Sequence, residues 1–312
     1  MRIGVDIMGS DHGPAVVVEA AVLAMRELPA DVRLTLIGDT TQIQAAIKQA
    51  GIDTATFDIV PSEDDITMHD SATKALVTKP KSSIAVGFNL LKEGTLDAFA
   101  STGNTGAMLV GSVLSVKTIP GVIRPCITTV LPKEDGSYGL LLDVGSNVDC
   151  KPDVLFQFGL LGSLLAQHVF HIAEPRVALL NIGEEAKKGN IVSQAAYELM
   201  KDTPQYRFVG NIEGRDLFNG KADVVVCDGF TGNVVLKAVE AFHELLMNRG
   251  IHDPFLDRFD YQNYGGTPVL GINGNVIIGH GISDAATIKN MILFTREVVQ
   301  SQLNDKIRAA VS

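Results

Sequence analysis

Short runs of apolar, mostly β-branched residues alternate along the chain with longer stretches that have helical hydrophobic spacing. The short runs predict buried strands at residues 3–7, 33–37, 56–60, 97–100, 177–181 and 224–227. The longer stretches predict helices at residues 14–28, 41–50, 105–116, 152–171, 191–201 and 234–247. This alternation favours an α/β fold whose mostly parallel sheet is covered by helices on both faces.

Two antiparallel hairpins interrupt the alternation. The first joins residues 126–131 to 138–143, and the second joins 268–272 to 276–278 across an Asn-Gly-Asn turn. A last helix is predicted at residues 283–303. Since no low-complexity linker or internal repeat occurs, we expect one domain over residues 1–312, with two lobes joined near 117–125 and 248–266.

The composition narrows the class of protein. A chain that is 46% hydrophobic and 20% charged is typical of globular proteins, and its formal net charge of −10 disfavours nucleic-acid binding. The three cysteines form no CxxC pair, so we expect reduced thiols in a cytosolic chain.

Two uncharged stretches, 98–116 and 154–173, approach the length of a membrane span. A turn cluster breaks the first and Gln and His side chains interrupt the second, so we expect neither to span a membrane.

Glycine and small polar residues gather directly after the predicted strands, in segments 6–14, 101–107, 143–147, 181–190 and 228–233. The carboxyl ends of parallel strands meet at one edge of a sheet, where the following helices present their N-termini. Five segments rich in glycine and small polar residues at one edge of the sheet therefore predict a binding site at that edge, in particular a site for an anion. Segment 101–106 offers glycines and hydroxyls that suit an anion cradle; a tight strand–helix turn capped by Asn or Thr is the alternative.

Searches for other chemistry exclude several classes of enzyme. The chain contains no GxxxxGK[ST], no GxGxxG and no GxSxG motif, so kinase, dehydrogenase and α/β-hydrolase interpretations lose their main support. His168 and His171 have no carboxylate or cysteine at ligand spacing, so we predict no metal.

Basic residues cluster at Lys74, Lys79 and Lys81, and again in the Gly-rich loop that carries Lys187 and Lys188. A solvated face is the ordinary explanation of such charges, but a lysine in that loop could neutralise a phosphate.

These segments also carry a resemblance to a known family. The matching segments are DIMGSD at 6–11, STGNTGA at 101–107, CDGFTGNV at 227–234 and YGGTPVLG at 264–271, together with 140–147, 179–190, 210–216 and 280–283. They resemble the bacterial phosphate acyltransferases, which are acyl-carrier-protein:phosphate transacylases of phospholipid synthesis. The match covers nearly the whole chain, although the stretch 248–263 is shorter than the helical segment usual in that family.

The resemblance implies a three-layer, Rossmann-like α/β/α sandwich related to phosphotransacetylases and to isocitrate and isopropylmalate dehydrogenases. It implies transfer of a long-chain acyl group from acyl carrier protein (ACP) to inorganic phosphate, without a nicotinamide or a metal cofactor. It further implies a cytoplasmic homodimer with weak contact at the inner face of the membrane. The acyl-phosphate product would pass to a membrane glycerol-3-phosphate acyltransferase, and a basic surface, with Lys74, Lys79 and Lys81 as candidates, would dock the acidic ACP.

Mechanistic roles follow as hypotheses for the residues of these segments. We expect Lys188 to supply charge to phosphate, Asn181 or Asn233 to support the oxyanion, and His280 to protonate the leaving thiolate. Asp228 is the candidate for orienting phosphate or accepting its proton, and capping the next helix is the alternative. The predicted substrate-binding residues are Ser101, Asn104, Thr105, Gly106, Asp143, Thr231, Gly232 and Asn233. Three other functions stay open: a short-chain phosphotransacetylase acting on CoA thioesters, a nicotinamide-dependent decarboxylating dehydrogenase, and a non-catalytic acyl or phosphate sensor.

Overall fold

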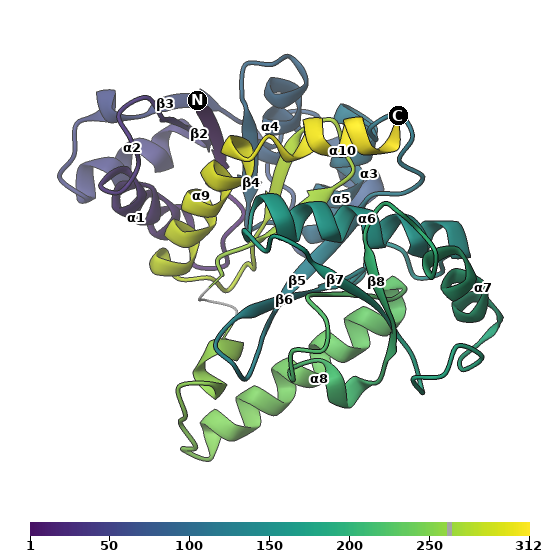
Figure 1. Ribbon diagram of the computed structural model, residues 1–312. Helices are drawn as coiled ribbons and strands as arrows, with labels where there is room; N and C mark the ends of the chain where they lie inside the picture. Colours follow the sequence, from purple (N-terminus) through teal and green to yellow (C-terminus); the bar gives the residue numbers. More distant parts are fainter. Residues whose placement is uncertain (261–263) are drawn as a thin grey trace. The chain divides into compact units, whose positions relative to one another are not determined.

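The computed structural model describes residues 1–260 and 264–312, which form two compact units (Figure 1). Unit 1 comprises Met1–Lys117 and Tyr261–Gln302, and unit 2 comprises Thr118–Asp260 and Leu303–Ser312. The predicted joint at 248–266 includes residues 261–263, which lie outside the described residues. The division into one domain with two lobes stays a prediction.

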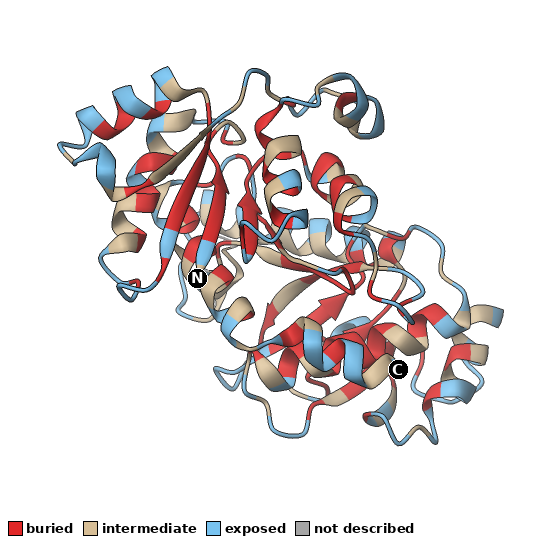
Figure 2. Ribbon diagram, turned by 90° about the horizontal axis from the view of Figure 1, so that it is seen from above, coloured by how far each residue is buried: buried red, intermediate tan, exposed pale blue. Residues whose placement is uncertain are grey.

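The sheet of unit 1 has the strand order β3-β2-β1-β4-β11-β10. Its strands are β1 (Arg2–Asp6), β2 (Arg33–Gly38), β3 (Asp58–Pro61), β4 (Ala98–Ser101), β10 (Thr267–Leu270) and β11 (Asn275–Ile278). Neighbouring strands are parallel except for the β10–β11 hairpin. The central strands are buried along most of their length, which is why they read as continuous apolar runs in the sequence (Figure 2).

Helices α1 (Pro14–Met25), α2 (Thr40–Gln49), α3 (Ala72–Thr78), α4 (Ser83–Lys92), α5 (Thr105–Gly111) and α9 (Ala285–Gln300) complete unit 1. A short 3₁₀ turn covers Thr54–Thr56, and a π-helical turn, Ser112–Val116, continues α5. Helix α1 packs against α2 and α9, and α4 packs against β1 and β4. These contacts bury the apolar faces that the helical spacing predicts.

The sheet of unit 2 has the order β5-β6-β9-β7-β8. Its strands are β5 (Cys126–Pro132), β6 (Tyr138–Leu142), β7 (Arg176–Leu180), β8 (Arg207–Ile212) and β9 (Val224–Val226). Only the β5–β6 hairpin is antiparallel among the pairs formed by these strands. The helices are α6 (Pro152–His168), α7 (Ile191–Met200), α8 (Gly229–Asn248) and α10 (Leu303–Val311), with 3₁₀ turns at Gly214–Asp216 and Leu256–Phe259. Helices α6 and α8 lie on opposite sides of this sheet (Figure 1).

The predicted α/β class with a mostly parallel sheet is confirmed, as are the predicted strands and both hairpins. Four elements were not predicted: β8, α3, α4 and α10. Strand β8 has no continuous apolar run in the sequence, because Gly210 interrupts it. This glycine has a φ of +98, and the pairing with β7 shifts register at this point. The last predicted helix, 283–303, ends at Gln300, since Gln302 adopts φ +52 before α10 begins.

The two uncharged stretches have other roles than membrane spanning. The stretch 98–116 divides into β4, α5 and the π-helical turn, and 154–173 is mostly α6, which buries Phe158 and Leu161. Within residues 1–260 and 264–312, no helix combines the length and the apolar character that crossing a bilayer requires.

Candidate functional site

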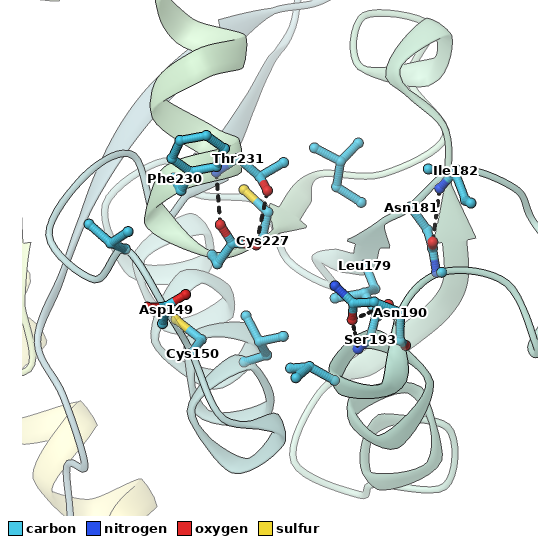
Figure 3. Close-up of a pocket in the computed structure, with 16 residues that line it drawn as sticks. Asp149, Cys150, Leu179, Asn181, Ile182, Asn190, Ser193, Cys227, Phe230 and Thr231 are labelled. Atoms are coloured by element: carbon cyan, nitrogen blue, oxygen red, sulfur yellow. Dashed lines mark hydrogen bonds between the residues drawn. The ribbon is translucent and has the colours of Figure 1, made fainter.

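A cavity of about 690 Å³ opens in unit 2 at the carboxyl ends of β7 and β9. Cys227, Phe230 and Thr231 line one side of it, and Asn181, Ile182, Asn190 and Ser193 lie across from them (Figure 3). Its walls include the first turns of α7 and α8 and the segment that leads into α6. Because helix N-termini expose unpaired N–H groups and the positive end of the helix dipole, this position favours an anionic ligand.

The segment 228–233 is the start of helix α8 and not a loop before it. Asp228 is the N-cap residue: its carboxylate accepts hydrogen bonds from the Thr231 backbone N–H at 2.8 Å and from the Thr231 hydroxyl at 2.9 Å. The helix therefore begins five residues before the predicted start at 234. Gly229 and Gly232 have low helix propensity, so the sequence did not indicate that the helix includes them. Asp228 and Thr231 both line the cavity, and their chemical roles stay predictions.

Gly232 allows helix α8 to approach the loop after β6 very closely. A Cβ atom at this position would lie 1.9 Å from the carbonyl oxygen of Asp143. One residue later, the Asn233 side-chain amide donates to the Val144 carbonyl at 3.1 Å. These two contacts hold the first turn of α8 against the loop 143–147, so they set the position of the cavity wall.

Asp143 organises that loop from inside the protein. Its side chain is fully buried and accepts hydrogen bonds from the Ser146 hydroxyl at 2.7 Å, the Asn147 backbone N–H at 2.6 Å and the Asn147 side-chain amide at 2.9 Å. A carboxylate with several internal donors is satisfied without a ligand. The geometry therefore gives Asp143 a positioning role, and its predicted contact with substrate stays a prediction.

The loop between β7 and α7 is shaped by Asn181. Its side-chain amide donates to the Lys188 carbonyl at 3.2 Å, and its Oδ1 accepts from the Ile182 N–H at 2.8 Å. Gly189, at φ +85, has no room for a Cβ, which would lie 2.4 Å from Asn181 Oδ1. The Lys188 side chain is half-exposed and its Nζ lies 3.9 Å from Glu185, so this ammonium is only loosely held.

Two cysteines contribute to the cavity lining, Cys150 before α6 and Cys227 at the end of β9. Burial, with the nearby carboxylates Asp143 and Asp228, raises the pKa of Cys150 to about 12, and burial raises the pKa of Cys227 as well. The thiolate is the nucleophilic form of cysteine, so both thiols are poor nucleophiles at neutral pH.

The other predicted site residues lie in unit 1, where two of the side chains are already engaged. The Ser101 hydroxyl donates to Asp6 at 2.6 Å, and burial raises the pKa of that carboxyl. Asn104 caps helix α5 by accepting from the Ala107 N–H at 2.9 Å, and its amide donates to the carbonyls of Thr67 and Asp70. The capped turn is therefore present, and anion binding by these two side chains stays a prediction.

The remaining predictions in unit 1 concern the start of α5 and the segment after β11. Thr105 is exposed, while a Cβ on Gly106 would lie 3.1 Å from the Ala72 methyl group. His280 is exposed and precedes Gly281, whose carbonyl accepts from the Asp11 N–H at 2.9 Å. A cavity of about 250 Å³ in this unit is lined by Asn104 and by the aspartates Asp11 and Asp65.

The three lysines proposed for ACP docking differ in their availability. Lys79 pairs with Asp70 at 2.9 Å, and Lys81 pairs with Glu63 at 2.7 Å, so these two charges are largely balanced by neighbouring acids. Lys74 lies on α3 and precedes both in the sequence. Among the residues that the structure describes, no three His, Cys, Asp or Glu side chains are placed to share a metal ion.

The sequence did not identify several of the residues that line the cavity. Asn190 caps α7 by accepting from the Ser193 N–H at 2.8 Å, and both residues line the cavity. The helix was predicted to begin at residue 191, as observed, and the pattern Asn-x-x-Ser directly after a glycine is the capping signal that could have identified these two residues. Ile182 and Phe230 carry no such signal, because an apolar side chain in a sequence looks the same whether it is buried or exposed.

Comparison with solved structures defines the fold class. The chain superimposes on a phosphotransacetylase from Streptococcus pyogenes with a TM-score of 0.67 at 17% identity, covering 96% of this chain and 94% of that one. A branched-chain phosphotransacylase from Enterococcus faecalis gives 0.65 at 16% identity, covering 96% and 99%. A 4-hydroxythreonine-4-phosphate dehydrogenase from Klebsiella pneumoniae gives 0.55 at 14% identity, covering 96% and 98%. The protein therefore has the α/β fold of the phosphotransacylases, as the resemblance implied.

Comparison of sequences is more specific. The sequence profile of a family described as "Fatty acid synthesis protein" matches residues 1–249. A phosphate acyltransferase from Cyanothece sp. is 43% identical, covering 99% of this chain and 95% of the relative. One from Dictyoglomus thermophilum is 38% identical, covering 100% and 98%. The chain belongs to the phosphate acyltransferase family, which is a family of transferases.

Proposed function

We propose that this protein transfers a long-chain fatty acyl group from the thioester of acyl-ACP to inorganic phosphate, giving acyl-phosphate and free ACP. The observation that carries the proposal is the unit 2 cavity, where two helix N-termini, hydroxyls and amides surround a space large enough for a phosphate and an acyl group. Membership of a family whose relatives are named phosphate acyltransferases supports it.

The reaction needs little from the protein besides binding and electrostatics. A phosphate oxygen attacks the thioester carbonyl, the carbonyl oxygen takes up negative charge, and the C–S bond then breaks to release the thiol sulfur with its electron pair. Phosphate is itself the nucleophile, and a thiol with a pKa of about 8.5 is a good leaving group. The protein must hold the phosphate beside the carbonyl and stabilise the oxyanion.

Within unit 2, the proposal assigns a part to four side chains. Lys188 balances the phosphate charge, Asn181 or Asn233 supports the oxyanion, and Asp228 orients phosphate or accepts its proton. Asn181 and Asn233 are already tied to carbonyl groups of their own loops, so any donation by them uses the second N–H of each amide. His280 and the start of α5 belong to unit 1, and their predicted roles in thiolate protonation and phosphate binding stay separate predictions.

The direct test is formation of acyl-phosphate, trapped with hydroxylamine, from palmitoyl-ACP and from acetyl-CoA at saturating phosphate. Product from palmitoyl-ACP alone is the expected result. Product from acetyl-CoA alone would instead indicate a short-chain phosphotransacetylase. The absence of product from both substrates would contradict the proposal and favour a binding protein.

Replacing Lys188 by alanine is expected to reduce kcat/KM for phosphate by about tenfold to a hundredfold, because one cation near the developing charge is lost. The side chain is half-exposed and loosely paired, so folding should be unaffected. Lys187→Ala is the matched control, since it removes a neighbouring charge of the same loop. Equal kinetics for the two variants and the wild type would remove Lys188 from the site.

Replacing Asp228 by asparagine separates its two candidate roles. Asparagine is as good an N-cap as aspartate, so the free energy of unfolding should change by less than about 0.5 kcal/mol. It cannot accept a proton from phosphate, so kcat is expected to fall by about a hundredfold. Thermal unfolding and steady-state kinetics on the same preparation test this; full activity in a stable variant would leave Asp228 only as a helix cap.

The proposal also includes a homodimer in the cytoplasm, with weak contact at the inner face of the membrane and delivery of product to a membrane glycerol-3-phosphate acyltransferase. An acyl-phosphate is a reactive mixed anhydride, and its long chain is poorly soluble in water. Delivery close to a membrane would therefore suit the product. Co-sedimentation with anionic vesicles at low and high salt tests the membrane contact.

A further inference from the structure

Three large apolar side chains are exposed around the unit 2 cavity. Val148, Ile182 and Phe230 have exposed fractions of 61%, 82% and 62%, and all three line the cavity. They come from three separate segments: the loop before α6, the loop after β7 and the first turn of α8. Figure 3 labels Ile182 and Phe230 on the last two of these segments. Exposed apolar side chains that gather on one concavity mark a place where an apolar ligand is bound. We call these three residues the apolar rim.

The apolar character continues from the rim into the cavity. Leu155 of α6 and Leu179 of β7 are buried and belong to the same lining, together with Val192 of α7. The polar groups of Asn181, Ser193 and Thr231 share the cavity with them. A ligand that satisfies both sets of groups has a polar, hydrogen-bonding head and an aliphatic chain.

The rim side chains stand on backbone that is held in place. The Ile182 N–H donates to Asn181 Oδ1 at 2.8 Å, and Phe230 lies in the turn of α8 that Asp228 caps. These two side chains are exposed although burying an apolar side chain is favourable. Such preorganisation lowers the entropy cost of binding a flexible chain.

We propose that the apolar rim receives the fatty acyl chain of the substrate and that Ile182 and Phe230 set the preference for chain length. This inference rests on the proposed acyl transfer, and it assigns the chain a path across these residues from the polar head in the cavity. Methylene groups close to the carbonyl contact Leu155 and Leu179, and later ones cover Phe230, Ile182 and Val148.

A protein surface is the competing occupant of this patch. The apolar face of α8 continues through Val234, Phe242 and Leu245, which are 53%, 60% and 52% exposed. At a rise of 1.5 Å per residue, Leu245 lies about 20 Å along the helix from Phe230. That distal face lines no part of the cavity, whereas the rim is continuous with the buried lining residues Leu155 and Leu179, which a flat protein surface would not reach.

The test compares acyl thioesters of increasing length, from butyryl to palmitoyl, in the wild type and in Ile182→Ser and Phe230→Ser. In the wild type, kcat/KM should rise by up to about fourfold for each methylene that reaches the rim. Each variant should lose at least about tenfold with palmitoyl and less than about threefold with butyryl substrates. Leu199→Ser is the matched control, since Leu199 is 49% exposed in the same unit but outside the cavity lining, and it should leave the profile unchanged.

Binding of dodecanoate and butanoate, measured by calorimetry, gives a readout that needs no turnover. If the wild type makes no acyl-phosphate but Phe230→Ser weakens dodecanoate binding selectively, the proposed function fails and the apolar site stands. Equal losses for short and long chains would overturn the inference. So would a change of oligomeric state in Phe230→Ser with an unaltered chain-length profile, because the rim would then be an interface between copies of the chain.

Discussion

Replacing Asp223 by alanine is expected to lower the free energy of unfolding by about 3–5 kcal/mol, because it leaves a buried ammonium without its counter-charge. Asp223 Oδ1 lies 2.6 Å from Lys133 Nζ, and the Lys133 side chain is only 2% exposed. Asp223 Oδ2 also accepts from the Arg176 guanidinium and backbone N–H, both at 2.9 Å. One carboxylate thus joins the start of β7, the β5–β6 hairpin and the segment before β9.

Chemical denaturation of Asp223→Ala beside the wild type measures this loss. Glu198→Gln is the control, since it removes an exposed ion pair with Lys201 in the same unit and should change stability by less than about 1 kcal/mol. Adding Lys133→Met to Asp223→Ala should restore part of the stability, because the unpaired charge is then gone. If the single variant unfolds like the wild type, the buried pair does not hold these strands together.

The same carboxylate gives a pH dependence with a definite sign. Burial alone would raise its pKa, but hydrogen bonds from Arg176 and Lys133 outweigh burial and lower the pKa from 3.8 to about 2. A pKa that is lower in the folded than in the unfolded state contributes stability above the unfolded value and loses it as the pH falls toward the folded value. The stability difference between wild type and Asp223→Ala should therefore be constant above pH of about 4 and narrow from there down to about 2.

Replacing Gly232 by alanine is expected to reduce kcat/KM by about a hundredfold or more, although Gly→Ala in an exposed helix normally stabilises by about 1 kcal/mol. The added Cβ would lie 1.9 Å from the Asp143 carbonyl oxygen and 3.0 Å from Cys227 Sγ. Backbone cannot yield as a flexible side chain can, so the first turn of α8 must move away from the loop 143–147. Asp228, Thr231 and Phe230 move with it, and the cavity loses its geometry.

Gly214→Ala is the control for this prediction, because Gly214 belongs to the same unit and a Cβ there meets nothing within 4 Å. Steady-state kinetics and thermal unfolding should show little change in that variant. An active Gly232→Ala would mean that the contact between α8 and the loop 143–147 tolerates displacement, and that the position of the cavity wall is not critical for turnover.

The predicted strands are correct because a buried parallel strand needs a continuous apolar run, and such a run can be recognised in the sequence itself. Strand β8 was missed because Gly210 and the shifted register break its pattern. Helices α3 and α4 were missed as well, although they are no shorter than α5 and α2, which were predicted. The start of α8 was misplaced for another reason. Its two glycines argue against a helix locally, yet Gly232 is needed where the helix meets Asp143.

Some features of the candidate site depend on nearby residues and could be predicted from the sequence, whereas others depend on distant segments. The capping interpretations of Asn104 and Asp228 depend on neighbours three residues away, and both caps are present. The close contact of Asp143 with Gly232 of helix α8, the raised pKa of Cys150 and the exposure of Phe230 depend on segments far apart in the chain. Nothing in the residues around each of them indicates those surroundings.

From its residues alone, this chain could be assigned an α/β fold, a mostly parallel sheet, the polar edge of that sheet and a family, because these depend on local periodicity and on motifs. The depth of the cavity, the pairing of Asp223 with Lys133 and the gathering of Val148, Ile182 and Phe230 at one opening became visible only in three dimensions. The reason is physical: burial, desolvation and complementarity arise between segments that the fold brings together, and no single segment contains them.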